Sequence, residues 1–384
     1  MTPPAAGEEQ IIARVAGSVL DVDAAAWDGC AGLGNPFVSH AFLAALEASE
    51  SVGPGTGWQP APILVDGADG SLAGALPAYV KSHSQGEYVF DHGWADAWQR
   101  AGGRYYPKLQ IAAPFTPVPG PRLLAHDAQV MRHLIAAAEA VTDRNGLSSA
   151  HATFVEEAQL GHFRDAGWLV REGIQYHWFN NGYRDFDDFL AALSSRKRKA
   201  IRKERATAQE GLTIRTLRGA EIEPHHWDAF WHFYQDTGTR KWGRPYLERS
   251  FFPRIGEAMG ESVLLYLAEK DGVPIAGALN FVGDEALYGR YWGCTVDVPC
   301  LHFELCYYRA IETAIELGLA RVEAGAQGEH KLARGYVATP TWSVHYIPNP
   351  GFREAVADFL ERERRAVERE IDFLGEVTPF RKVD

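Results

Sequence analysis

One order of structural signals occurs twice in this chain. Residues 63–94 and residues 265–293 each read as a strand, a turn with Asp-Gly, the letters AGAL, a second strand, a polar turn and an aromatic-rich strand. Asp-Gly between apolar runs is a strong hairpin signal. Repetition over this length indicates a duplicated unit, so the chain is expected to contain one fold twice.

The segments after each hairpin also correspond. Residues 127–147 and 303–319 have the period of amphipathic helices, and a strand, a short helix and a further strand are expected after each. Antiparallel strands followed by a strand–helix–strand unit form a mixed α/β layer. We predict an α/β fold of the mixed α+β type, with two tandem domains over residues 1–178 and 179–384. Each domain should be a mixed sheet with helices on both faces.

Five phrases spread over the chain carry a family resemblance. They are NPFVSHAFLAALE (35–47), YYPKLQIAAPFTPVPGPRLL (105–124), LSSRKRKAIRKER (193–205), LHFELCYY (301–308) and GAQGEHKLARGY (325–336). Together with the repeated element order, they resemble the FemAB-like predicted N-acyltransferase family, a twin-GNAT group related to the Fem-type peptidoglycan-bridge aminoacyl ligases. The resemblance implies two GNAT-like domains and an enzyme that transfers an acyl group to an amine.

Polar side chains crowd the stretch GAQGEHK, residues 325–331, which follows a predicted strand. Acyl transfer to an amine needs a general base, and carboxylates and histidine serve in that role, while an amide can orient a carbonyl. The candidate catalytic residues are Glu323, Gln327, Glu329, His330 and His302. The alternative is a solvated loop, but the resemblance places this stretch near the transfer site. The sequence contains no G-x-S-x-G and no Walker A motif, which favours direct attack without a covalent nucleophile or ATP.

Basic and turn-rich segments are the candidate binding sites for the donor. The run RKRKAIRKER, residues 196–205, has seven basic residues against one acidic residue. The candidate donor-binding residues are Arg196, Arg198, Lys331, Arg122, Lys108 and Thr116. Acyl-CoA is the expected donor, as a co-substrate without a permanently bound cofactor, although the junction at 294–308 lacks the usual GNAT phosphate loop. Aminoacyl-tRNA, as in a cell-wall-type ligase, is the alternative donor, and a solvated helix face or an ordinary connector would also explain these segments.

The acceptor amine stays open between an amino lipid, a muropeptide and a small amine. The candidate acceptor-binding residues are Asp91, His92, Tyr291, Trp292, Glu304 and Arg334. The four cysteines match neither a zinc-knuckle spacing nor a disulfide framework, so reduced thiols and no metal are expected. A non-catalytic binding protein with the same fold is the alternative from outside the enzymes.

The net charge of −12 argues against general nucleic-acid binding, although a local basic site remains compatible with it. The N-terminus, MTPPAAGEEQ, does not read as a secretory signal, and no run approaches 18 uninterrupted apolar residues. We expect a cytoplasmic protein of the bacterial cell-envelope pathway. Peripheral contact of the basic run with anionic lipids at the inner membrane face is a further expectation.

Overall fold

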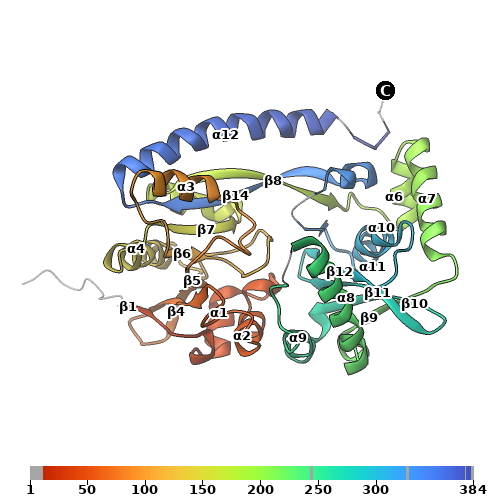
Figure 1. Cartoon of the computed structure of the whole chain (residues 1–384), viewed down its shortest axis with the longest axis horizontal. Coiled ribbons are helices and arrows are strands. Elements are labelled where there is room, and N and C mark those ends of the chain that lie inside the picture. The colour runs from red at the N-terminus through yellow and green to blue at the C-terminus, as the bar shows by residue number, and fades with distance from the viewer. Residues whose placement is uncertain (1–11, 243–244, 326–327, 377, 382–384) are drawn as a thin grey trace, which may run out of the picture.

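The computed structural model describes residues 12–242, 245–325, 328–376 and 378–381, with the side chains of 237–242 and of 329 left out. Eleven strands form one sheet in the order β2-β5-β6-β7-β14-β8-β13-β12-β11-β10-β9, and a small sheet has the order β1-β3-β4. Figure 1 shows the two halves side by side, joined through the middle of the large sheet.

The first half supplies eight strands and five helices. The strands are β1 (Ile12–Val15), β2 (Trp58–Pro60), β3 (Ile63–Asp66), β4 (Leu72–Leu76), β5 (Ala78–Lys81), β6 (Lys108–Ile111), β7 (Ala150–Val155) and β8 (Leu169–Phe179). The helices are α1 (Ala24–Ala31), α2 (His40–Ala48), α3 (His92–Arg100), α4 (Ala128–Arg144) and α5 (Leu160–Asp165).

The second half begins after β8. Its strands are β9 (Thr213–Arg218), β10 (Val263–Lys270), β11 (Val273–Val282), β12 (Ala286–Cys294), β13 (Arg321–Glu323) and β14 (Val337–Tyr346). Its helices are α6 (Phe186–Ala192), α7 (Ser195–Gln209), α8 (Pro224–Trp242), α9 (Phe251–Met259), α10 (Leu301–Phe303), α11 (Arg309–Glu316) and α12 (Pro350–Glu376). A π-helical turn, η6 (Glu304–Tyr308), joins α10 to α11, and a 3-10 helix, η7 (Glu329–Arg334), precedes β14.

The order of elements confirms the mixed α/β fold and the internal repeat. The series β1, α1, α2, β3, β4 corresponds to β9, α8, α9, β10, β11, and the series β6, α4, β7, β8 corresponds to β12, α11, β13, β14. In both halves the strand pair around the long helix is parallel, β6 with β7 and β12 with β13, whereas the strands before it are antiparallel.

The aromatic-rich strand predicted at the end of residues 63–94 is wrong, because β6 takes the place of the third strand. Tyr88 has a left-handed backbone conformation, with φ of 57°, which interrupts an extended chain. Glu87 and Asp91 both turn inward to the buried ammonium of Lys108. The extended chain is therefore interrupted at Tyr88, and helix α3 begins at His92.

The two halves exchange their last strands. β8 leaves the first half and pairs with β13, while β14 from the second half pairs with β7. The exchanged strands also pair with each other, from Leu169–His345 to His177–Val337. The long helix α12 contacts both β8 and β14 and runs along the two halves (Figure 1). The predicted boundary between residues 178 and 179 falls at the end of β8 and stays a prediction.

An aromatic core also joins the halves. Phe37 of the first half packs edge-on against Phe42 and against Phe281 and Tyr288 of the second half, with ring centroids 5.0–5.2 Å apart. Edge-to-face pairs of this kind stabilise a core beyond the burial of their area. Throughout the described residues, no helix combines the length and the apolar composition that a membrane span requires.

Candidate active site

The parallel strands β12 and β13 separate after Tyr288 and Glu323. They pair only from Ala286–Arg321 to Tyr288–Glu323, and β12 then continues to Cys294 with β11 alone. On the other side of β13, the exchanged strand β8 places His177 opposite Glu323. The point where the two strands separate, here called the opening, is bordered by residues of both halves.

Glu323 is buried at this opening. Its Oε1 accepts a hydrogen bond from Nε of Arg321 at 2.9 Å. Its Oε2 has no hydrogen-bond partner among the described residues and lies 3.9 Å from Nε2 of His177. Burial raises the pKa of Glu323 to about 7, although Arg321 and Arg290 act to lower it. A carboxyl group with this pKa can accept a proton from a substrate at neutral pH.

His177 and Gln175 of β8 extend the polar cluster, and sequence reasoning missed both. Nε2 of His177 lies 3.1 Å from Oε1 of Gln175, whose Nε2 donates to the carbonyl of Pro117 at 2.9 Å. Burial lowers the pKa of His177 to about 3, so the ring is neutral at working pH. The sequence does contain a signal for both residues. Arg171, Gln175 and His177 are polar residues at odd-numbered positions of one strand, and such positions share a face of the strand.

Lys331 is buried near the same opening. Its Nζ donates to the carbonyl of Gly325 at 2.8 Å. Burial lowers the pKa of Lys331 to about 7, and Arg290 acts in the same direction. The ammonium is therefore only partly charged at neutral pH, which suits a hydrogen-bond donor to a developing oxyanion better than the predicted permanent anion contact.

Two predicted residues, Tyr291 and Thr116, meet across the halves. Thr116 is buried and Tyr291 is half-buried; burial raises the pKa of Tyr291, while Arg290 and Thr116 act to lower it. Nη2 of Arg290 donates to the carbonyl of Phe115 at 2.7 Å. The Pro-rich connector of the first half therefore forms a wall of the opening in the second half.

Three further candidates gather around the π-helical turn η6. The ring of His302 lies 5.3 Å from the rings of Trp292 and Tyr307 and 6.3 Å from that of His330. Oη of Tyr307 and Nε2 of His330 are hydrogen bonded at 2.8 Å. Turns of π-helix are frequent at functional sites. Gln327 and the side chain of Glu329 lie outside the described residues, and their roles stay predictions.

Glu304 occupies the first turn of the helix that follows β12. It is fully buried and accepts hydrogen bonds from Arg205, Gln209 and Arg309 at 2.9–3.1 Å. Helix starts attract anions because the first backbone N–H groups are unsatisfied. The side chains of Arg205 and Gln209 from α7 and of Arg309 from α11 give Glu304 a structural environment.

Arg334 is likewise held within the protein. Its guanidinium lies 3.5 Å from the ring centroid of Phe303 and donates to Glu204 and to the hydroxyl of Tyr308 at 2.9 and 3.0 Å. A third donor, Nη1, reaches the carbonyl of His330 at 2.8 Å. These contacts fix η7 against η6, so Arg334 supports the wall of the site.

Arg122, Lys108 and Asp91 lie in the interior of the first half. Arg122 is buried and donates to the carbonyls of Thr153, Val118 and Pro121, which stabilises the Pro-rich connector. Lys108 forms ion pairs with Asp91 and Glu87, and the hydroxyl of Tyr105 donates to Asp91 at 2.6 Å. The structure does not bring these residues to the opening at Glu323. His92 is exposed at the start of α3.

The basic run on α7 stays at the surface. Arg202 pairs with Asp187, and Arg205 is committed to Glu304. The remaining residues, here named the basic strip, are Arg196, Lys197, Arg198, Lys199 and Lys203. Within the described part of the chain they form no ion pair, and α7 contacts both α10 and η7. The strip therefore flanks the side of the site where helix α10 begins.

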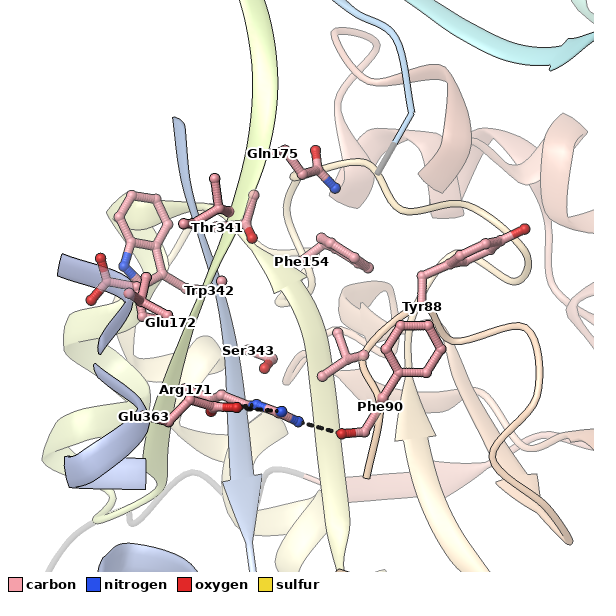
Figure 2. Close-up of a pocket in the computed structure, with 14 residues that line it drawn as sticks. Tyr88, Phe90, Phe154, Arg171, Glu172, Gln175, Thr341, Trp342, Ser343 and Glu363 are labelled. Atoms are coloured by element: carbon pink, nitrogen blue, oxygen red, sulfur yellow. Dashed lines mark hydrogen bonds and ion pairs between the residues drawn. The ribbon is translucent and has the colours of Figure 1, made fainter. Parts of the chain in front are cut away.

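A separate pocket of about 300 Å³ lies between the loop at Tyr88–Phe90 and α12 (Figure 2). Gly173, Thr341 and Ser343 belong to the paired strands β8 and β14 at its floor, and Gln175 borders it toward Glu323. At its other end Arg171 bonds Glu363 of α12 at 2.7 Å and the carbonyl of Phe90 at 2.7 Å. The sequence gives no sign of this pocket, because its lining comes from five separate segments.

Solved structures with this arrangement include FemX, with 13% identity, a TM-score of 0.56 and coverage of 88% of this chain and 98% of that chain. A conserved protein of unknown function from Bacteroides thetaiotaomicron has 10% identity, a TM-score of 0.52 and coverage of 85% and 98%. L-PGS from Bacillus licheniformis has 11% identity, a TM-score of 0.50 and coverage of 85% and 98%. At these identities the likeness shows a shared fold.

Among curated proteins, none matches this sequence. The sequence pattern of the FemAB-like family, described as peptidoglycan biosynthesis/recognition, matches residues 18–382. The match includes all five phrases that carried the resemblance, together with both halves of the repeat. The chain belongs to the FemAB-like family.

Proposed function

We propose that the protein is an N-acyltransferase that moves an acyl or aminoacyl group from an activated donor to an amine, with Glu323 as the general base. The observation that carries this proposal is the buried carboxyl group where β12 and β13 separate, one oxygen of which has no hydrogen-bond partner among the described residues. The family's description, peptidoglycan biosynthesis/recognition, agrees with an amine acceptor from the cell envelope.

The reaction requires little beyond positioning and one proton transfer. The amine, protonated at neutral pH, must lose a proton, and the free Oε2 of Glu323 accepts it. The amine nitrogen then attacks the donor carbonyl carbon, and Lys331 donates a hydrogen bond to the developing oxyanion. When the tetrahedral intermediate collapses, the bond between the carbonyl carbon and the donor's carrier breaks. The carrier leaves with the second proton of the amine. Holding the two reactants together can supply about 7–11 kcal/mol of the barrier reduction.

The carrier of the donor should be a polyanion bound by the basic strip. The start of the helix after β12 holds Glu304, and the corresponding connector in the first half is fixed by Arg122. At both places a buried charged side chain is already held by partners within the protein. A nucleic acid spreads its phosphates along a surface, so the strip favours aminoacyl-tRNA as the donor. Acyl-CoA, the first expectation, is the competing donor, because the net charge of −12 disfavours a broad nucleic-acid surface.

Parallel transfer assays test the proposal and separate the donors. Purified protein would receive either tRNA charged with radiolabelled alanine or radiolabelled acetyl- and lauroyl-CoA, each with lysine-containing muropeptides, phosphatidylethanolamine vesicles and free lysine. We expect RNase-sensitive labelling that Glu323→Gln lowers by at least about a hundredfold, within the range of a general base. Labelling from acyl-CoA alone would move the donor assignment to CoA. Acceptor binding without transfer from any donor would identify a non-catalytic binding protein and refute the enzyme.

A further inference from the structure

His177 of the first half lies beside Glu323 of the second half. The strand exchange places β8 next to β13, and His177 lies opposite Glu323 in their antiparallel register. Both side chains are buried. Nε2 of His177 is 3.9 Å from Oε2 of Glu323, which has no hydrogen-bond partner among the described residues. Hydrogen bonds of an active site are often long without substrate and shorten in the complex, so a small movement would join these two atoms.

The amide of Gln175 determines which nitrogen of His177 carries the proton. Nε2 of Gln175 donates to the carbonyl of Pro117 at 2.9 Å, so the amide oxygen is the atom that faces His177. This oxygen only accepts hydrogen bonds, and it lies 3.1 Å from Nε2 of His177. Burial lowers the pKa of His177 to about 3, so the ring is neutral and has a single N–H. That N–H is therefore on Nε2, the nitrogen that faces Oε2 of Glu323.

An N–H at this position favours one charge state of Glu323. Arg321 donates to Oε1, so the proton of the neutral acid is carried by Oε2. The N–H of His177 bonds an ionised Oε2 more strongly than a protonated one, and a hydrogen bond to the charged form stabilises that form. His177 in this tautomer therefore supports the carboxylate, which is the form that takes a proton from the amine.

Other charged and titratable groups also act on this pair. They are Arg321 of β13, Arg290 and Tyr288 of β12, and Lys331 of η7. The arginines keep their charge throughout the working range of pH, and burial raises the pKa of Tyr288, so this residue stays neutral. Burial lowers the pKa of Lys331 to about 7, so Lys331 titrates in the same range as Glu323. A test of the pair thus needs a signal from Glu323 itself.

The first copy of the repeat replaces both members of the pair. Ala152 of β7 stands in the register position of Glu323. Val344 of β14 lies opposite Ala152, as His177 of β8 lies opposite Glu323. The carboxyl group and the imidazole are thus present together in one copy, and two apolar side chains take their places in the other. This pattern is expected if the imidazole serves the carboxyl group.

We propose that His177 is a positioning residue, whose Nε2–H, oriented by Gln175, holds Oε2 of Glu323 in the ionised form that accepts a proton. The inference rests on the proposed function, in which Glu323 is the general base, and adds a residue of the first half to it. It gives the strand exchange a consequence for the reaction, because only the exchanged strand β8 brings this N–H beside β13.

Four variants separate the N–H of His177 from the shape of its side chain. His177→Phe keeps a planar ring without a donor, whereas His177→Gln places an amide N–H near the position of Nε2. Gln175→Met leaves the ring in place and removes the amide that orients it, so it carries the same test if His177→Phe does not fold. Thr339→Val is the matched control, because Thr339 lies opposite Gln175 on β14 and its hydroxyl bonds the carbonyl of Val337.

Carbon-13 NMR of protein labelled at the glutamate Cδ would follow the titration of Glu323 without any substrate. The signal of Glu323 is the one that disappears in Glu323→Gln. We expect His177→Phe to raise the pKa of Glu323 by about one pH unit, since it loses a hydrogen bond to a charged group. Gln175→Met should raise it by less, while His177→Gln and Thr339→Val should stay close to the natural protein. An unchanged pKa of Glu323 in both His177→Phe and Gln175→Met overturns the inference.

Transfer kinetics test the same pair in the reaction. Relative to the natural protein, kcat/KM of His177→Phe should fall about tenfold at pH 6 and recover by pH 9, because the ionised fraction of the base decreases tenfold per pH unit below its pKa. A loss that is equal at all pH values, or that His177→Gln does not rescue, would make His177 a packing residue and overturn the inference.

The two proposals fail in different ways. Transfer that persists in Glu323→Gln, with a shifted titration of Glu323 in His177→Phe, would refute the base and leave the pair standing. Transfer that is lost in Glu323→Gln, with neither readout changed in His177→Phe, would refute the pair and leave the function standing.

Discussion

Replacing Glu323 with glutamine should make the protein more stable and less active, and the stability gain should depend on pH. Burial raises the pKa of Glu323 from 4.5 to about 7. Between these values the folded state holds a proton that the unfolded state releases, so wild-type stability falls as pH rises through this window. A difference of about 2.5 units corresponds to roughly 3 kcal/mol at pH 8. Glutamine carries no charge and avoids this loss.

Urea denaturation of both proteins at pH 5 and pH 8 would measure the effect. The stability of Glu323→Gln relative to wild type should increase between the two pH values by up to about 3 kcal/mol. The control is Glu285→Gln, because Glu285 is an exposed partner of the same Arg321. An exposed ion pair contributes about 0–1 kcal/mol, so this control should show little change with pH. A stability difference for Glu323→Gln that is the same at pH 5 and pH 8 would refute the assignment of an uncharged, buried carboxyl group.

In the active enzyme, kcat/KM should rise with pH up to about 7 and then level off, since the base must be deprotonated.

Three other perturbations have defined outcomes. Charge reversal by Arg196→Glu and Arg198→Glu should weaken donor binding at least tenfold and flatten its dependence on salt in a titration series; unchanged binding would make the basic strip a solvated helix face. Phe37→Ala should lower the free energy of unfolding by about 3–5 kcal/mol, and hydrogen exchange should show lost protection in both halves, whereas loss confined to the first half would contradict a shared core. Asp91→Asn should lower the free energy of unfolding by about 3–5 kcal/mol, because it leaves the buried ammonium of Lys108 with less negative charge around it. The activity per folded molecule should persist, and a specific loss of activity would place the first-half ionic cluster in the reaction.

The fold could be predicted from the sequence because its signals are local. Asp-Gly turns, alternating strands and the amphipathic stripe of residues 303–319 each depend on neighbours in the chain, and their repetition gave the order of elements. The failure at residues 87–94 has a non-local cause. Glu87 and Asp91 turn inward to Lys108, which lies 21 and 17 positions farther along the chain, respectively. No pattern within residues 87–94 reveals that partner.

The candidate site could be predicted only in part, because some of its residues have local signals in the sequence and others depend on partners far along the chain. Glu323 could be found because it ends a recognisable strand before a polar loop. His177 and Gln175 could not, because their role depends on the pairing of β8 with β13, which follows from the strand exchange. For Arg122 and Glu304 the sequence predicts ligand contacts, and these roles stay predictions. In the structure, internal carbonyls bind Arg122 and arginines bind Glu304.

The strand exchange gives the duplication its functional meaning. If each half had kept its own last strand, His177 and Gln175 would lie in the first half and Glu323 would be bordered by β14 alone. With the exchange, a first-half strand runs from Gly173, which pairs with β14, to His177, which lies opposite Glu323 of β13. Ala152 stands in the register position of Glu323, so the two copies of the repeat differ at this point. The exchange thus brings a strand of the first half beside Glu323 of the second half.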